Sequence, residues 1–371
     1  MKKNFYFGFL TWLFSIAIIY FFIFLFFFTN LDKYIYGYTL SDISSLNFYT
    51  KNSKIVNHLR NPEFNYSKNL EDYIFTRFTN NSKKEMVLLQ GDSWFNDIEK
   101  FKSSAQSLKM LGKDFNIINA GTVSYSPSLM SVQLKLLKES FNIDPKYLIT
   151  YIDQTDIGDE NCRYKNLKKY DVRNNLIAIP FEEYPYSGKI LNIDQMLKFS
   201  QIKLNNHNNI SRTFSVINYK LKKGLVKLKQ NYLKKIKDYP YSGACHIEDI
   251  LRPLINENPE EIIYFKKSLK EYFDRINSNK KIKKTFVVTH PHKAHLVDKK
   301  YNVNVADIVD EVINNYPNFY HINFSKKIKN NNLYNKLENI WAEDEIHLNE
   351  KNHSEIFLPE IIKDFLSLKN N

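Results

Sequence analysis

The sequence predicts an α/β fold built around a parallel sheet, and two observations indicate it. Apolar runs of about five residues recur along the chain, which suits strands that are buried on both faces of a sheet. Patterns typical of amphipathic helices lie between these runs. Alternation of strand and helix favours an open α/β sandwich. The predicted strands are Met86–Gln90, Phe115–Asn119, Tyr147–Tyr151, Thr285–Thr289 and Phe319–Asn323.

Four helices are predicted, over 129–141, 260–276, 306–316 and 355–368. The second is the best defined, because its apolar residues recur mostly every three or four positions. Pro259 stands just before it, where proline is tolerated at the start of a helix. We expect these helices to cover the sheet.

The chain begins with an apolar segment, residues 5–28, that contains no charged residue. It is long enough to span a bilayer as a helix. Lys2 and Lys3 precede it, which favours an N-terminus that stays in the cytoplasm. Residues 26–30 lack the small side chains of a signal-peptide cleavage site. We therefore expect an uncleaved, single-pass signal anchor, with the rest of the chain in the periplasm or on the cell surface; a buried helix of a soluble protein is the alternative.

Two further segments lack the alternation of strand and helix. Residues 29–84 are polar and aromatic without a clear period, and we expect a stalk or linker there. The main domain would then cover 85–371, with an insertion over 163–258. Within the insertion, residues 219–238 contain eight lysines and one acidic residue. A solvated helix face is the common explanation of such a run, and contact with lipid headgroups or an anionic glycan is the alternative.

The formal net charge of +13 attracts anionic surfaces without choosing among lipid, acidic glycan and nucleic acid. We do not expect nucleic acid as a partner, because the predicted strands lack interleaved aromatic and basic residues for base stacking.

The chain has two cysteines, Cys162 and Cys245. In an exported domain such a pair favours a disulfide, and two buried thiols are the alternative.

The first predicted strand leads directly into Gly91-Asp92-Ser93. Glycine permits a tight turn, and a serine that follows it emerges at the carboxyl edge of the sheet, beside the amides of a helix N-terminus. This position suits a nucleophile whose tetrahedral intermediate needs an oxyanion hole. An ordinary turn, in which Asp92 or Ser93 caps a helix, is the structural alternative.

Near the C-terminus, Asp344 and His347 stand three residues apart. A serine nucleophile needs a base, and the base needs a carboxylate that fixes its tautomer. In this hypothesis His347 takes the proton of Ser93, and Asp344 holds the other ring nitrogen. A capping aspartate and a surface histidine before the last helix would produce the same spacing.

Together and in this order, the motifs resemble those of the SGNH, or GDSL, hydrolase superfamily. The run Met86 to Trp94 is similar to the family's first block, with Trp94 in place of the usual leucine. Asn119-Ala120-Gly121 is similar to the second block, which implies that the Gly121 amide is an oxyanion donor beside the amide of Ser93.

The same resemblance covers residues 85–371, with Asp344 and His347 as the family's fifth block. It implies a three-layer α/β/α, flavodoxin-like sandwich. It also implies a serine hydrolase that needs no metal or other cofactor.

The third block departs from the family. The family has Gly-x-Asn-Asp there, and the asparagine side chain is its third oxyanion donor. Here the strand leads into Asp153-Gln154-Thr155-Asp156, so that Thr155 stands in the place of the asparagine. Its hydroxyl is a shorter donor, and Gln154 would assist if the turn shifted. Loss of one donor costs about two to three orders of magnitude in rate, so the departure concerns catalytic efficiency rather than the fold.

His290, His292 and His295 follow the fourth predicted strand, and three histidines this close can bind a metal. No acidic residue or cysteine stands beside them, so we expect them at the rim of the site, with His290 lining a substrate pocket.

His353 is a weaker candidate for the base, because it lies further into the last helix. The serines near the second block, which we expect to be polar turn residues, are Ser124 and Ser126.

Two functions fit these motifs. The first is an extracytoplasmic esterase or deacetylase, or an O-acyltransferase if a sugar hydroxyl rather than water takes the acyl group. Membrane-tethered members of the superfamily often act on acetyl groups of envelope polysaccharide or peptidoglycan, so the resemblance implies an acyl ester substrate of this kind. The second is a glycan-binding or scaffold protein that kept the fold and lost the activity.

Overall fold

The computed structural model describes most of the chain. The described residues are 2–28, 43–60, 69–81, 83–180, 193–206, 211–212, 214–218, 221–222, 245, 247–331, 333–334 and 337–369. The chain divides into two compact units: a first unit, Met1–Lys51 with Glu183–Ala244, and a sheet unit, Asn52–Glu182 with Cys245–Asn371. The lysine-rich segment 219–238 lies outside the described residues, apart from residues 221–222.

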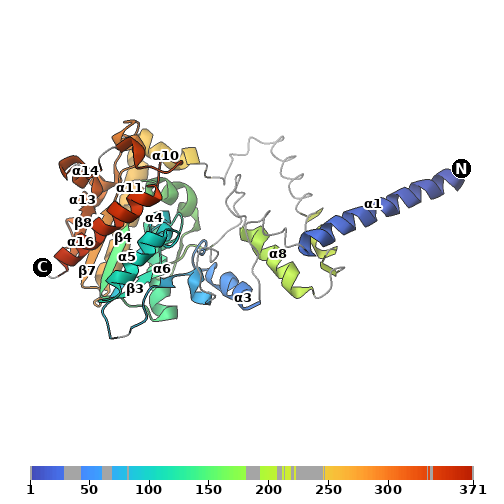
Figure 1. The fold of residues 1–371 in the computed structure, drawn as a ribbon, viewed down its shortest axis with the longest axis horizontal. Helices are drawn as coiled ribbons and strands as arrows, with labels where there is room; N and C mark the ends of the chain where they lie inside the picture. The colour runs from blue at the N-terminus through green and yellow to red at the C-terminus, as the bar shows by residue number, and fades with distance from the viewer. Residues whose placement is uncertain are drawn as a thin grey trace. The chain divides into compact units, whose positions relative to one another are not determined.

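In the first unit, α1 (Lys2–Phe28) is one uninterrupted helix (Figure 1). Its stretch Tyr6–Leu25 is long and apolar enough to cross a membrane, and the protein buries none of it. The other long described helices that belong mainly to this unit are α3 (Ile43–Asn52) and α8 (Ile193–Asn205).

The sheet unit is built on a mostly parallel sheet. Its strands are β1 (Thr76–Arg77), β2 (Met86–Gln90), β3 (Asn116–Asn119), β4 (Tyr147–Tyr151), β7 (Lys284–Thr289) and β8 (Phe319–Asn323). They lie in the order β1-β3-β2-β4-β7-β8, and all neighbours are parallel except β1 and β3. The five parallel strands coincide, to within one residue at either end, with the strands predicted from sequence. The mixed α/β architecture is therefore confirmed.

Helices cover both faces of this sheet (Figure 1). On one face, Val87 of β2 belongs to the same apolar core as Leu108 and Phe365, which lie on helices. On the other face, the side chain of Gln90 accepts a hydrogen bond from Tyr272 at 2.7 Å. The first face carries α5 (Lys102–Leu111), α14 (Phe324–Asn331) and α16 (Leu358–Leu368), and the second carries α6 (Pro127–Phe141), α11 (Pro259–Ser278) and α13 (Val305–Ile313).

Short helical segments complete the unit and connect the strands to the longer helices. They are η2 (Leu70–Tyr73), α4 (Ser93–Asn96), η3 (Asp97–Glu99), α7 (Asp156–Gly158), η4 (Asp159–Tyr164), η5 (Lys165–Leu167), α10 (Ile247–Ile255), α12 (Lys293–Leu296), η6 (Leu337–Asn339), α15 (Glu350–Asn352) and η7 (His353–Phe357). Several of them follow the carboxyl ends of parallel strands, where α/β proteins place their ligands.

Part of the segment expected to be a stalk, 29–84, belongs to the sheet unit instead. β1 pairs with β3 at the edge of the sheet. Arg60 forms a buried ion pair with Glu99 and donates to the carbonyl of Asn119 at 3.1 Å. These contacts join residues far apart in the sequence, so no local pattern reveals them.

The predicted insertion, 163–258, is likewise divided. Its first part forms a hairpin of β5 (Lys169–Tyr170) and β6 (Leu176–Ala178) in the sheet unit. Its last part contains α10, which packs against α7 so closely that a Cβ on Gly158 would lie 2.1 Å from a carbonyl oxygen of α10. Cys162 and Cys245 are joined in a disulfide, which decides between the two alternatives left open by the sequence.

Candidate active site

Ser93 begins α4, directly after β2. Asp92 caps this helical turn, because its carboxylate accepts a hydrogen bond from the Trp94 amide at 3.0 Å. Gly91 has no room for a side chain, since a Cβ there would lie 2.9 Å from the Cβ of Tyr151. This tight turn places Ser93 at the carboxyl edge of the sheet.

Ser93, His347 and Asp344 form a continuous chain of hydrogen bonds. Ser93 Oγ lies 2.6 Å from His347 Nε2, and His347 Nδ1 lies 2.6 Å from Asp344 Oδ2. A carboxylate oxygen only accepts, so Nδ1 carries the proton and the neutral ring can accept from the serine at Nε2. The structure thus joins the three residues in the geometry of a nucleophile, a base and an orienting acid.

Asp344 is held in place by its own loop. Its Oδ1 accepts the backbone amides of Ile346 at 3.0 Å and of His347 at 2.9 Å. A bond from the Ala342 amide to the His347 carbonyl, 2.8 Å long, closes the loop. Partial burial opposes ionisation of Asp344, but its hydrogen bonds with His347 outweigh that effect and hold its pKa well below the usual range.

The same interaction raises the pKa of His347. Burial disfavours the charged imidazole, yet the hydrogen bond and charge of Asp344, with the nearby carboxyls of Asp92 and Asp97, raise the pKa of His347 to about 9. The imidazole is therefore protonated on both nitrogens and positively charged at neutral pH. It must lose the proton on Nε2 before it can accept the proton of Ser93.

Trp94 lies at the centre of an aromatic cluster beneath the site. It is fully buried, and its ring centroid lies 5.0 Å from that of Tyr151, 5.0 Å from that of His290 and 5.9 Å from that of His347. The tryptophan that replaces the family's leucine thus packs against the imidazole of the triad.

Gly121 lies beside α4, but its amide is occupied. The amide donates to Asn119 Oδ1 at 3.0 Å. A Cβ on Gly121 would lie 2.6 Å from the carbonyl carbon of Phe95 and 2.7 Å from the Asn96 nitrogen, so only glycine fits. The structure explains the glycine by this close approach, and the amide that the resemblance implies as an oxyanion donor already has an acceptor.

The structure also directs Gln154 away from Ser93. Its Nε2 donates to the carbonyl of His290 and to Asn304 Oδ1, both at 3.1 Å, and its Oε1 accepts from the Val305 amide at 2.9 Å. Both amide hydrogens are therefore used, and neither remains for an oxyanion. The physical reason is that the N-terminus of α13 needs a partner, and the buried glutamine supplies it.

Thr155 is turned toward Asp153. Its hydroxyl donates to Asp153 Oδ2 at 2.5 Å, and its amide donates to the same oxygen at 3.1 Å. In this arrangement the hydroxyl that stands in the place of the family's asparagine is also engaged.

Asp153 is the residue of this site that the sequence reasoning missed. It is buried, and it accepts from His292 Nε2 at 3.0 Å and from the Tyr151 hydroxyl at 3.3 Å. Burial raises the pKa of Asp153, but the charge and hydrogen bond of His292 prevail and lower it. By contrast, burial and the charge of Asp153 raise the pKa of Asp92 well above its usual range. The available signal was the position of Asp153, two residues after the end of β4.

The histidines after β7 pack into the protein rather than lying open at a rim. His290 is fully buried, contacts the Tyr334 hydroxyl at 3.1 Å, and has a pKa that burial lowers to about 3. His292 is buried on Asp153, and His295 Nε2 bonds to a backbone carbonyl at 2.9 Å. Among the residues that the structure describes, no group of histidine, cysteine and acidic side chains could hold a metal ion.

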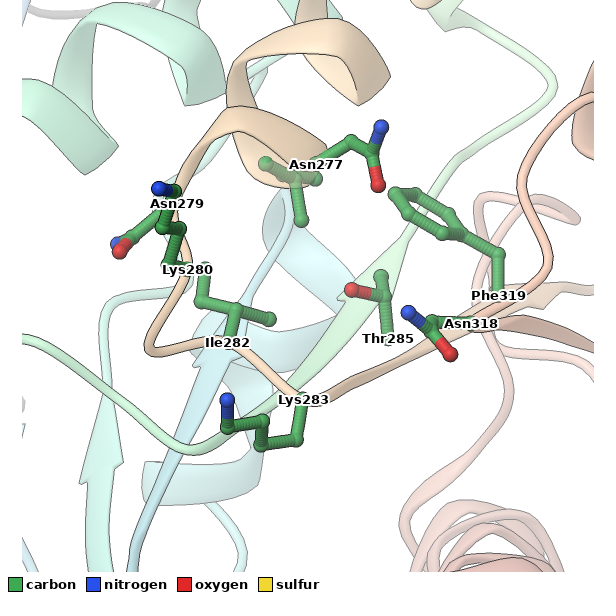
Figure 2. A pocket seen from close by; sticks show the side chains of 9 residues that line it. Asn277, Asn279, Lys280, Ile282, Lys283, Thr285, Asn318 and Phe319 are labelled. Atoms are coloured by element: carbon green, nitrogen blue, oxygen red, sulfur yellow. The ribbon is translucent and has the colours of Figure 1, made fainter.

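Figure 2 shows a surface hollow between the end of α11 and the starts of β7 and β8. It has a volume of about 310 Å³ and is lined by Asn279, Lys283, Thr285 and Asn318, among others. Thr285 lies near the amino end of β7, whereas Ser93 and Asp153 follow the carboxyl ends of β2 and β4. The hollow is therefore at the opposite edge of the sheet from the triad.

The fold and the site together define a mixed α/β protein with a hydrogen-bonded Ser–His–Asp triad at the carboxyl edge of its sheet. No protein-family model matches the chain, and no curated protein matches it.

Solved structures give weak likenesses. The psychrotrophic esterase EstA from Pseudoalteromonas sp. is 10% identical over 78% of this chain and 100% of its own, with a TM-score of 0.36. An acetyl-xylooligosaccharide esterase from Geobacillus is 11% identical over 75% of this chain and 94% of its own, with a TM-score of 0.37. An α/β hydrolase from the metagenome of Lake Arreo is 10% identical over 76% and 97%, with a TM-score of 0.35. Similarity at this level carries no argument about activity.

Proposed function

We propose that the chain is a serine esterase, deacetylase or O-acyltransferase that cleaves an acyl ester through Ser93. The observation that carries the proposal is the pair of 2.6 Å contacts that joins Ser93 to His347 and His347 to Asp344. Serine hydrolases on unrelated folds share this arrangement of nucleophile, base and orienting carboxylate. Its location at the carboxyl edge of a parallel sheet adds support.

In the proposed reaction, Ser93 Oγ attacks the ester carbonyl while His347 takes the hydroxyl proton. Asp344 orients the imidazole and stabilises its charged form. His347 then gives the proton to the leaving alcohol as the ester bond breaks, which leaves an acyl group on Ser93. Water or a sugar hydroxyl next attacks the acyl group, again with His347 as base, and Ser93 is released.

The oxyanion of the tetrahedral intermediate needs preorganised donors. The Ser93 amide is one, because the first amides of a helical turn have no partner within the helix. Thr155 would serve only if its hydroxyl turned away from Asp153. Gly121 and Gln154, the other donors implied by the resemblance, would have to give up the acceptors that they hold in this structure.

We also propose that the sheet unit lies outside the cytoplasm and that its substrate is an acetyl or related acyl ester of a cell-envelope glycan. The apolar helix α1 and the Cys162–Cys245 disulfide support export, since disulfides persist in oxidising compartments. A C-terminal alkaline phosphatase fusion should be active in an intact bacterium. An inactive, stable fusion would contradict export.

The enzymatic proposal is tested on the full chain in detergent micelles. It should hydrolyse p-nitrophenyl acetate and be labelled by a fluorophosphonate. Ser93→Ala should abolish both signals without lowering the melting temperature, whereas Ser103→Ala, at an exposed position on α5, should change neither. A folded wild-type chain that shows neither turnover nor labelling would refute the proposal.

A binding or scaffold protein is the second candidate. The engaged amides of Gly121 and Gln154 favour it, because they leave fewer oxyanion donors than the family has. Such a protein would bind acetylated oligosaccharides without consuming them. Calorimetric titration of wild type and Ser93→Ala with an acetylated oligosaccharide, followed by a product assay, separates binding from turnover.

A further inference from the structure

The turn that follows Gly121 contains a residue in a strained backbone conformation. The Tyr125 amide donates to the Thr122 carbonyl at 3.1 Å, which closes a four-residue turn. The third residue of this turn, Ser124, has φ of 59°. Type II turns require a positive φ at this position, and glycine is the usual residue there. A serine that keeps this conformation must be held by its surroundings.

Two side chains from outside the turn hold the two peptides that flank Ser124, one on each side of it. His58 Nε2 contacts the Val123 carbonyl oxygen, and the Tyr164 hydroxyl donates to the Ser124 carbonyl at 2.7 Å. A carbonyl oxygen only accepts, so His58 Nε2 carries the proton. The Tyr125 hydroxyl in turn donates to the His58 carbonyl at 2.7 Å, and its ring packs edge-on against the imidazole.

Because the Val123 carbonyl is fixed, the direction of the Ser124 amide is fixed as well. The peptide bond is trans, so its C=O and N–H point to opposite sides. His58 lies on the carbonyl side, and the N–H therefore points away from it. Within the described part of the chain this amide has no acceptor, and Ser124 is only half-buried.

The turn runs beside the residues that carry Ser93. The Thr122 amide donates to the Gly91 carbonyl at 2.9 Å. Gly121 packs against the backbone of Phe95. Gly91 and Phe95 stand two residues before and two residues after Ser93 in the chain. The loop therefore contacts the nucleophile turn on both sides of the serine.

We propose that the Ser124 amide is the second oxyanion donor of the site and that His58 is the positioning residue that aims it. The inference rests on the proposed function of Ser93. Gly121 cannot fill this role while its amide donates to Asn119. Separately, burial lowers the pKa of His58 to about 4, so the ring is neutral and has a single N–H. This N–H lies on Nε2, because the Val123 carbonyl is a much nearer acceptor than Asn57 Oδ1, which lies 3.3 Å from Nδ1.

The chemical consequence concerns the transition state. When Ser93 Oγ bonds to the ester carbon, the carbonyl π electrons move to the oxygen, and no proton is transferred to it. The amides of Ser93 and Ser124 donate to this oxygen, and their hydrogen bonds strengthen as its charge grows. A donor of this kind raises kcat and leaves KM largely unchanged.

The first test uses kinetics of the full chain with p-nitrophenyl acetate, with kcat expressed per site titrated by a fluorophosphonate. His58→Ala should lower kcat about tenfold to a hundredfold and change KM less than about twofold. His58→Gln should recover most of the loss, because its amide can donate to the Val123 carbonyl. His321→Gln, on the edge strand β8, is the matched histidine control and should keep kcat.

The second test uses a probe of the charged intermediate. A boronic acid forms a tetrahedral, negatively charged adduct on an active serine, so His58→Ala should weaken its binding by the same factor as kcat.

The outcomes are distinct. An unchanged kcat in a folded His58→Ala chain would overturn the inference, and so would boronic acid binding that His58→Ala leaves unchanged. A fall only in the titrated fraction or in melting temperature would give His58 a structural role and would also overturn it. If the wild-type chain is neither active nor labelled, the proposed function itself has failed.

Discussion

His353 Nε2 donates to the Trp94 carbonyl at 3.0 Å and so holds the helical turn that begins with Ser93. A carbonyl only accepts, so the other nitrogen, Nδ1, accepts from Ser104 Oγ at 3.2 Å, which also contacts Ser354 Oγ at 2.8 Å. Burial lowers the pKa of His353 to about 4. The histidine that was a weaker candidate for the base is instead a neutral, buried side chain that joins the C-terminal region to the turn that contains Ser93.

The hydrogen bond from His353 to the Trp94 carbonyl predicts that His353→Ala is less stable than wild type. The change would remove the His353 donor from the buried Trp94 carbonyl and leave Ser104 with only its contact to Ser354, which costs about 1–3 kcal/mol in the free energy of unfolding. Urea denaturation of the detergent-solubilised chain, followed by near-ultraviolet circular dichroism, measures it. Lys351→Ala, at an exposed position nearby, is the control. Equal unfolding midpoints for the two variants would argue against a stabilising role for the His353 hydrogen bonds.

The raised pKa of His347 predicts that ester hydrolysis increases at alkaline pH. Only the neutral imidazole can accept the proton of Ser93, so kcat/KM should rise with pH through an apparent pKa near 9. Asp344→Asn removes the charge that raises this pKa, and it should shift the midpoint toward 6.5. The same change should lower the plateau by up to about 10⁴-fold, because the tautomer is lost. A wild-type midpoint at the ordinary histidine value would contradict the electrostatic account.

The close approach at Gly121 predicts that Gly121→Ala is destabilising. The new methyl group would lie 2.6 Å from backbone and side-chain carbons of Phe95, and overpacking of this kind costs about 1–3 kcal/mol. Because the loop leads into the turn that contains Ser124, kcat should fall as well. Gly8→Ala is the control, since nothing lies within 4 Å of its position. Thermal unfolding and p-nitrophenyl acetate turnover measure the two effects.

Gln154→Ala separates two roles for the same side chain. If the glutamine only ties the β4 edge to the start of α13, the variant should lose stability and keep kcat within about threefold. If it moves to stabilise the oxyanion, kcat should fall by about two to three orders of magnitude. We expect the first result, and stopped-flow turnover combined with urea denaturation of the same sample decides between them.

The parallel strands were predictable because their signal is local. Each is a short apolar run with a polar or glycine residue at its end, and Ser93 follows the first of them directly. The meeting of Ser93 with His347 is different, because 254 residues separate the pair. Only the resemblance to a known order of motifs linked them before the structure did.

Other features depend on tertiary contacts that no local pattern encodes. β1 is two polar residues long and has no apolar signature, yet it pairs with β3. Arg60 is buried because Glu99, thirty-nine residues away, neutralises it. The resemblance placed the Gly121 amide in the oxyanion hole. In the structure this amide donates its hydrogen bond to the neighbouring Asn119 side chain instead. Whether a donor is free depends on such neighbours, which the motif does not contain.

The disulfide between Cys162 and Cys245 has a further consequence for the segment between them. The two Cα atoms are 5.9 Å apart although 83 positions separate them, so the bond closes a long loop whose two ends meet at nearly one point of the sheet unit. A protease that cuts once inside this loop would produce two fragments that still migrate as one chain until a reductant is added.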